Sequence, residues 1–272
     1  MIDSFILAIQ QPFFVRSIFL VVLLASVFPL YGNLVVVRQE ANIAHTFAHI
    51  GLLGVAIGLW FDWSIELSIL WSIVLTVLFL YALWIREQHS QTTHNEIWAQ
   101  LGLVWAILLV SQMTWYRADI SSYLFWDILL LWTQDVILIA IIVGTTGILY
   151  AIFSKKRYAL SMHKSLAASK GINTTLSYLL YLVALWVLIG WAMKLIGVLL
   201  VSAFLILPSS ISKSLASNLL QRKLIGNIVC ILLSVGALFL SWHYDMPSWA
   251  SIVWCMIVAY LLIEIYRKVK SV

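Results

Sequence analysis

The chain of 272 residues is 63% hydrophobic and only 10% charged, and its formal net charge is +5. Soluble domains carry about 25% charged residues, so this composition excludes an ordinary soluble protein. Apolar runs long enough to cross a hydrocarbon core of about 30 Å recur along the sequence, and they leave no room for a separate soluble domain. The sequence therefore predicts a single all-α integral membrane domain over residues 1–272.

The predicted membrane spans follow one another closely along the chain. They cover residues 13–37, 43–60, 64–85, 97–115, 132–153, 175–192, 195–208, 224–242 and 248–266. The seventh run is short for a full crossing, and glycines interrupt the sequence between Gly190 and Gly197. We therefore expect a polytopic bundle of eight or nine transmembrane helices, one of them short or broken.

The distribution of basic residues predicts the orientation. When nine spans alternate between the two sides, 13 of the 16 Lys and Arg residues fall on one side, and only Arg16, Arg117 and Lys194 fall on the other. Basic residues collect in cytoplasmic loops, so we expect the C-terminus in the cytoplasm and the N-terminus outside. This topology also accounts for the positive net charge, which favours contact with membrane lipid and gives no reason to expect a nucleic-acid partner.

The longest predicted cytoplasmic connection covers about residues 154–174. It contains a short helix-forming stretch, Leu166 to Ile172, in which Gly171 can end a helix. A short amphipathic helix at this place is typical of a lipid-surface anchor or of a docking element for a partner. The spacing alone leaves both interpretations open.

The second predicted span contains the most informative polar residues. His45 and His49 are separated by one helical turn, so they share one face of the helix. Ionisable residues inside a span are costly and often line an ion or substrate path. Imidazole nitrogens are common ligands of zinc. We therefore interpret the pair as part of a metal path, in preference to two neutral histidines that bond to neighbouring helices.

Two other uses of the histidine pair conflict with the sequence. A zinc metalloprotease helix has the pattern HExxH, whereas Thr46 follows His45 here, so the catalytic base is missing. A bis-histidine haem needs ligands on opposite sides of the iron, which one helix face cannot supply. The chain also lacks a GxxxxGK[ST] loop, so it has no ATP site of the P-loop kind.

Other polar residues give weaker signals. Several map to the predicted outer side, where solvated loop positions are favoured over a cation-attracting vestibule; they are Asp62, Glu66, Arg117, Asp119, Asp127, Asp135, His243 and Asp245. His89 and His94 lie in the predicted inner loop from Arg86 to Glu96, where a solvent-exposed role is favoured over metal binding. Glu264, near the inner end of the last span, is expected either to extend its carboxylate to the membrane surface or to pair with Arg267 or Lys268.

Several segments resemble one known family in the correct order. The segment HTFAHIGLLGVA at 45–56 is similar to the family pattern D-x-L-x-H-A-x-L-P/L-G-V-A, and DISSYLFWDIL at 119–129 is similar to D-L-M-S-Y-L-F-G-D-I-L. LAASKGI at 166–172 resembles the coupling-helix pattern L-A-x-x-x-G-I, and the segment from Lys194 to Pro208 resembles V-G-V-L-L-V-S-A-L-L-I-I-P. YDMP at 244–247 matches Y-x-x-D-x-P loosely.

These segments are typical of the permease subunits of bacterial zinc/manganese/iron ABC transporters. The resemblance implies a multi-pass protein of the bacterial inner membrane that forms a homodimer and carries a divalent metal as cargo, with no permanently bound cofactor. It also implies a cytoplasmic ATP-binding subunit that contacts Leu166 to Ile172, and an extracytoplasmic metal-binding protein. Zinc is the expected cargo, with manganese or iron as alternatives. The residues associated with cation coordination in the family fall on His45 and His49.

The sequence departs from the family pattern at three places. His45 stands where the family has Asp, which replaces a hard oxygen ligand with nitrogen and disfavours manganese relative to zinc. Trp126 stands in place of Gly, and Ser248-Trp249 stands in place of Gly-Pro. A gradient-driven secondary transporter remains an alternative, although it predicts matching broken helices in both halves. A membrane-embedded assembly or enzyme subunit would need a catalytic set that the sequence does not show.

Overall fold

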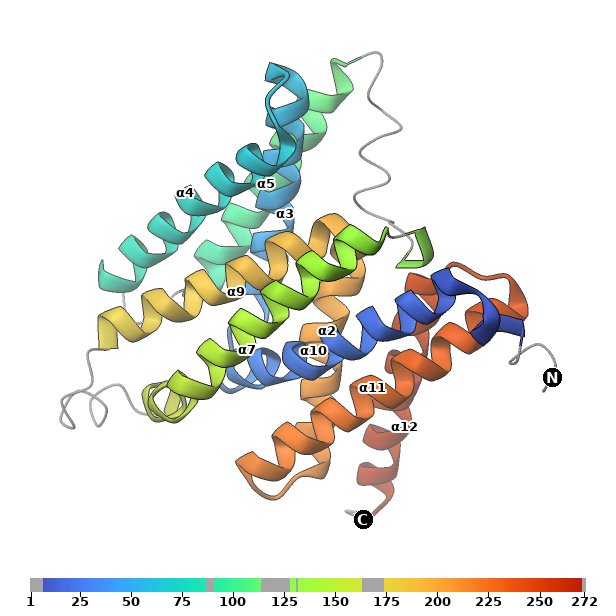
Figure 1. The fold of residues 1–272 in the computed structure, drawn as a ribbon. Helices are drawn as coiled ribbons and strands as arrows, with labels where there is room; N and C mark the ends of the chain where they lie inside the picture. Colours follow the sequence, from blue (N-terminus) through green and yellow to red (C-terminus); the bar gives the residue numbers. More distant parts are fainter. Residues whose placement is uncertain (1–6, 87–90, 114–127, 131, 163–173, 271–272) are drawn as a thin grey trace.

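The computed structural model describes residues 7–86, 91–113, 128–130, 132–162 and 174–270. Within these ranges the chain forms nine α-helices, one short 3-10 helix and no β-strand (Figure 1). The elements are α2 (Pro12–Val37), α3 (Asn42–Phe61), α4 (Ile65–Arg86), α5 (Gln91–Ser111), η1 (Ile128–Leu130), α7 (Thr133–Met162), α9 (Thr174–Ile196), α10 (Val198–Leu215), α11 (Leu219–Tyr244) and α12 (Ser248–Lys270). The all-α prediction is confirmed for these residues, and each predicted apolar run corresponds to one α-helix.

Six of the helices are long and apolar enough to cross a membrane by length and composition. They are α2, α3, the 133–152 part of α7, the 176–193 part of α9, α11 and α12. Shorter apolar stretches occur in α5, at Asn95–Ser111, and in α10, at Leu199–Leu215. A polytopic membrane fold is therefore confirmed, whereas the number of eight or nine crossings stays a prediction.

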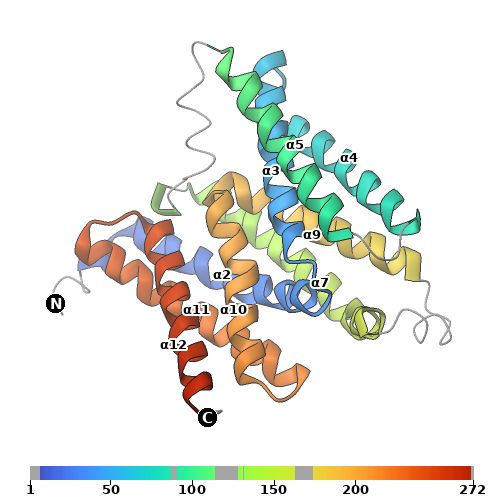
Figure 2. The same ribbon diagram turned by 180° about the vertical axis from the view of Figure 1, so that it is seen from behind.

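The helices pack in two groups that share α9. In Figures 1 and 2, α3, α4 and α5 lie together at one end of the molecule, and α2, α10, α11 and α12 lie at the other. The first group has a small core of its own around Leu52, Ala56 and Ala106. Other residues of α3 join the main core, among them Phe47 and Ala48. In the most apolar part of α3, 72% of the residues are buried, whereas the corresponding fraction in α12 is only 22%. Helix α3 is therefore central in the bundle and α12 is peripheral.

Helices α2 and α10 approach each other closely at Gly32. A Cβ atom added to Gly32 would collide with the carbonyl oxygen of Leu205 and with the side chain of Ser209. Small residues allow this kind of close helix contact inside membranes, where packing replaces the hydrophobic effect as the source of association. Gly32 therefore sets the distance between the two helices.

Buried polar side chains at the same crossing form what we call the α2–α10 network, which comprises Asn33, Ser209, Ser212 and the carbonyl of Pro29. Asn33 Nδ2 donates to Pro29 O at 2.9 Å, and Ser209 Oγ donates to the same carbonyl at 3.2 Å. Ser212 Oγ donates to Asn33 Oδ1 at 3.3 Å. The buried amide and hydroxyls therefore find hydrogen-bond partners inside the apolar crossing, where an unsatisfied polar group would be costly.

Helices α9 and α10 are separated by a single residue. Gly197 adopts φ 80° and ψ 156°, a conformation that a side chain would strain, and the two helices meet there at a sharp corner (Figure 1). The interruption that the sequence predicts between Gly190 and Gly197 thus lies at Gly197, since α9 continues without a break to Ile196. The seventh predicted run is a separate helix, and it continues beyond Pro208 to Leu215.

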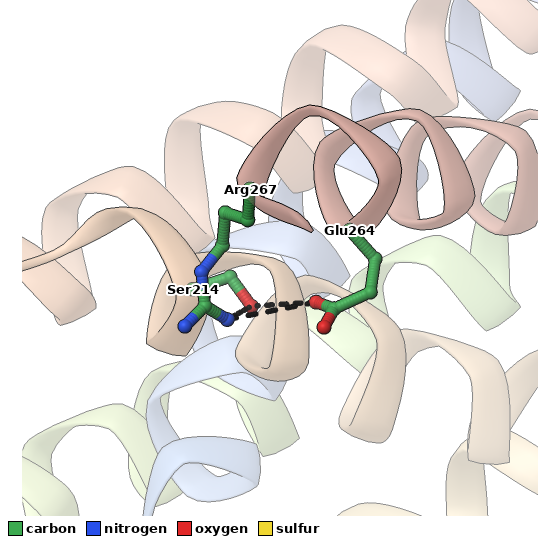
Figure 3. Close-up of polar contacts among 3 residues, drawn as sticks. All are labelled: Ser214, Glu264 and Arg267. Atoms are coloured by element: carbon green, nitrogen blue, oxygen red, sulfur yellow. Dashed lines mark hydrogen bonds and ion pairs between the residues drawn. The ribbon is translucent and has the colours of Figure 1, made fainter. Parts of the chain in front are cut away.

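A polar cluster joins the ends of α10 and α12 (Figure 3). Arg267 Nη1 lies 3.5 Å from Glu264 Oε2 and donates to Ser214 Oγ at 3.1 Å. Ser214 Oγ in turn donates to the Glu264 carboxylate at 3.5 Å. The predicted pairing of Glu264 is therefore confirmed with Arg267. More than a third of each charged side chain is exposed, so water screens this contact.

Two sequence segments with a predicted role lie outside the described residues. One is the coupling stretch 166–172, and the other is most of the motif at 119–129, including Trp126. Only η1 at the end of that motif is described, and it contacts α2 through a hydrogen bond from Ser17 Oγ to Ile128 O at 3.0 Å.

Candidate metal site

His45 and His49 lie on α3 with their rings in contact. The ring centroids are 3.9 Å apart and the ring planes are inclined by 53°. The predicted shared face is therefore confirmed. His45 is exposed in the isolated chain, whereas His49 retains only 8% of its exposure. The imidazole of His45 can thus contact a ligand that approaches from outside the chain, whereas the imidazole of His49 lies among the packed helices.

The buried imidazole has an unused nitrogen. A backbone hydrogen bond connects the His49 ring with Ala99 on α5. Its Nδ1 is buried and has no hydrogen-bond partner among the described residues. Nearly all buried polar groups in proteins are hydrogen-bonded, so each exception needs an explanation. A nitrogen lone pair kept for a passing metal ion is one such explanation.

The α3–α5 contact fixes the helix that carries the pair. A Cβ atom on Gly102 would lie 2.5 Å from Ile50 Cδ1 and 3.3 Å from the backbone carbon of His49, so α5 passes close to α3 at this level. Thr46 Oγ1 donates across the same interface to Asn95 O at 3.0 Å. Thr46, which stands where a metalloprotease has its catalytic Glu, therefore connects α3 with α5.

The pair can supply two nitrogen ligands. Among the described residues, no group of three or more His, Cys, Asp or Glu side chains is placed to hold a metal ion. Structural zinc sites are closed by four protein ligands, whereas sites that exchange ligands keep open positions. Two imidazoles with open positions suit brief coordination rather than permanent binding.

Those residues of the predicted outer side that the structure describes do not join the histidine pair. Asp62 and Asp245 end α3 and α11 in left-handed conformations, with φ 55° and 50°, and both are exposed. Asp135 accepts a hydrogen bond from Trp132 N at 3.1 Å at the start of α7. His243 is also exposed, with its ring 4.9 Å from that of Tyr244. These contacts agree with solvated helix ends.

Several other predicted positions cannot be placed relative to the pair. His89, Arg117, Asp119 and Asp127 lie outside the described residues, as do the side chains of Glu66 and His94.

A buried ion pair between α2 and α3 was not predicted from the sequence. Arg38 Nη2 lies 3.0 Å from Glu40 Oε1, and the two side chains are only 12% and 8% exposed. Burial lowers the pKa of Arg38 and the Glu40 carboxylate raises it, and the net shift is upward, so the guanidinium stays charged. The ion pair could have been suspected from the sequence, because two opposite charges lie two residues apart in the short connection between two predicted spans.

The chain is similar to known proteins over nearly its whole length. A model of the ABC 3 transport family matches residues 10–267. The chain is 28% identical over 245 residues to the high-affinity zinc uptake system membrane protein ZnuB of Buchnera aphidicola subsp. Schizaphis graminum, which covers 88% of this chain and 92% of that protein. It is likewise 28% identical over 238 residues to ZnuB of Haemophilus influenzae, with 85% and 88% covered.

The fold is similar to a solved structure, that of PsaBC from Streptococcus pneumoniae in complex with Fab. The TM-score is 0.83 at 21% identity, and the match covers 97% of this chain and 95% of that chain. Since the family model extends over nearly all the helices described above, this chain belongs to the ABC 3 transport family.

Proposed function

We propose that this chain is the membrane permease subunit of an ATP-driven importer of divalent transition metal ions, and that zinc is the cargo. Family membership and the zinc-uptake relatives support this function. The observation that carries the proposal is the contact between His45 and His49 on the most buried apolar helix. The chain contains no P-loop, so ATP is hydrolysed in a separate subunit.

The assembly that fits this function has several parts. The chain is a single transmembrane domain over residues 1–272 with eight or nine crossings of the bacterial inner membrane, and its C-terminus is cytoplasmic. Two copies form a homodimer, and a cytoplasmic ATP-binding subunit docks on Leu166 to Ile172 within the segment 154–174. An extracytoplasmic metal-binding protein delivers the ion. The exposed apolar side chains of the outer helices, such as Trp71, Leu232 and Trp254, suit contact with lipid.

The two histidines act as a transit site in this proposal. His45 is exposed and receives the ion, and the free Nδ1 of His49 provides the second nitrogen. An ion in transit must bind strongly enough to enter and weakly enough to leave, so few ligands are an advantage. The nitrogen at position 45 favours zinc over manganese, which prefers oxygen ligands.

The test is zinc uptake by proteoliposomes that contain the permease, its ATPase and its binding protein. Replacing both residues, as His45→Ala with His49→Ala, should abolish ATP-dependent uptake while the protein remains folded in the membrane. His243→Ala is the matched control, because it removes an exposed imidazole away from the pair. Uptake that survives the double replacement would contradict the ligand assignment. Competition by manganese and iron in the same vesicles identifies the cargo.

A further inference from the structure

The turn between α2 and α3 is held tightly at both ends. Arg38 N donates to Leu34 O and Glu40 N donates to Val35 O, each at 3.0 Å, so the turn is bonded back onto α2. Glu40 O accepts from Ile43 N at 2.9 Å, which bonds the same turn to the first turn of α3. The Arg38–Glu40 ion pair therefore moves with the start of the helix that carries the histidines.

The same ion pair also contacts a third helix. The guanidinium carbon of Arg38 lies 4.8 Å from the ring centroid of Tyr178 and 5.2 Å from that of Tyr181. Both tyrosines are almost completely buried, and they lie within the first turns of α9, which begins at Thr174. The cation is attracted to both buried rings, so a shift of α9 shifts the guanidinium with it.

The ion pair does not use all its hydrogen-bonding groups. Arg38 Nε and Glu40 Oε2 are buried and have no hydrogen-bond partner among the described residues. Buried charged groups are normally paired through every donor and acceptor, because an unsatisfied one is costly. The 3.0 Å contact between Nη2 and Oε1 therefore carries the link between the guanidinium and the turn, and removing the Glu40 charge should break that link.

These contacts form a continuous connection through three helices, and the inference drawn from it rests on the proposed function. We propose that the Arg38–Glu40 ion pair is the positioning contact that passes movement of α9 to α3, and thereby sets the position of His45 and His49 during ATP-driven transport. Helix α9 begins directly after the predicted coupling segment, so it receives the movement that the ATPase produces. Arg38 and Glu40 act through the histidines and do not touch the ion.

The test measures zinc uptake and ATP hydrolysis together in proteoliposomes that hold the permease, its ATPase and its binding protein. Glu40→Gln keeps the size of the side chain and removes the charge. It should lower the number of zinc ions imported per ATP by about tenfold, as expected for a residue that modulates coupling without touching the ligand. ATP hydrolysis stimulated by the metal-loaded binding protein should continue. The charge exchange Arg38→Glu with Glu40→Arg should restore part of the ratio.

The Glu264–Arg267 pair gives a matched control. Glu264→Gln also breaks an ion pair near a helix end, but that pair is exposed, lies within α12 and reaches α10 only through Ser214. It should leave the zinc-to-ATP ratio unchanged. Arg38→Lys keeps the charge and loses the planar stacking on the two tyrosines, so it should give an intermediate ratio and serves if Glu40→Gln does not assemble.

The outcomes separate this inference from the proposed function. A wild-type complex that imports no zinc would overturn the proposed function together with the relay built on it. Wild-type zinc import with a normal zinc-to-ATP ratio in the Glu40→Gln and Arg38→Lys variants would overturn the relay alone. The relay would also be overturned if zinc uptake and ATP hydrolysis fell by the same factor in the variants. An equal fall would mean that fewer complexes are intact and that the coupling within each complex is normal.

Discussion

The α2–α10 network and the histidine pair both place polar side chains between apolar helices, but they differ in how far their hydrogen bonds are completed. In the network, Asn33 bonds through its amide nitrogen and its oxygen, and the hydroxyls of Ser209 and Ser212 each reach a further backbone carbonyl. In the pair, His49 keeps a buried nitrogen without a partner in the described part of the chain. Completed bonds hold two helices together, whereas an open nitrogen is available to a ligand.

The difference between these two regions predicts opposite consequences for mutation. Changes in the network should reduce the free energy of unfolding and leave the transport of each folded complex unaltered. Changes in the histidine pair should reduce the transport of each folded complex, beyond any effect they have on the free energy of unfolding.

The largest effect is expected for His49→Ala. The change removes the buried nitrogen ligand, and zinc uptake should fall by about a hundredfold, since losing even a hydrogen-bond partner of a metal ligand can cost that much. The variant also loses a buried ring and its hydrogen bond with Ala99, so thermal stability in detergent is measured beside uptake, and uptake is counted per folded complex. Uptake per folded complex that stays near the wild-type level would place the ring in the same class as the α2–α10 network.

The next effect is expected for Gly32→Ala. The new methyl group meets the carbonyl oxygen of Leu205, which belongs to the backbone and cannot turn away. The helices must separate, and the free energy of unfolding should fall by about 2 kcal/mol. Gly144→Ala in α7 is the control, because no atom lies within 4 Å of the position of its added Cβ. Equal stability of the two variants would contradict the close approach.

A smaller effect is expected for Asn33→Leu. The change removes the bonds to Pro29 and Ser212, and interhelical hydrogen bonds in membranes are worth about 1 kcal/mol. The free energy of unfolding should fall by about that amount. Zinc uptake per folded complex, measured against the quantity of protein extracted, should match the wild type. A selective loss of transport would mean that the network takes part in the transport cycle.

The smallest effect is expected for His45→Asp, which retains a metal ligand and changes only its chemistry. An oxygen ligand suits manganese better than the imidazole does, so competition uptake should shift towards manganese. Total uptake at saturating metal should remain near the wild-type level. If the preference for zinc does not change, another component of the transporter determines the selectivity.

Most of the helices could be predicted from the sequence because membrane spans depend on local hydrophobicity. Each apolar run corresponds to a helix, and the interruption near Gly197 follows from the glycine itself. The contact between His45 and His49 also follows from local spacing, since one helical turn separates them. Local patterns were sufficient wherever the interacting residues are neighbours in the sequence.

Contacts between distant parts of the sequence could not be predicted in the same way. Asn33 bonds to Ser212, and Arg38 lies on Tyr178 and Tyr181, although long stretches of chain separate these residues. Hydrophobicity is nearly uniform along the spans, so it gives no indication of which helices become neighbours. The open nitrogen of His49 likewise depends on the position of α5, which no local pattern fixes.

The single-residue link at Gly197 has a consequence for the synthesis of the protein. Helix α10 contains five serines and only a short apolar stretch, so it enters lipid poorly by itself. One residue cannot reach across the headgroup region, so α10 cannot remain in water while α9 settles in the bilayer. We therefore expect the two helices to enter the membrane as one unit, in which the strongly apolar α9 carries its weaker neighbour.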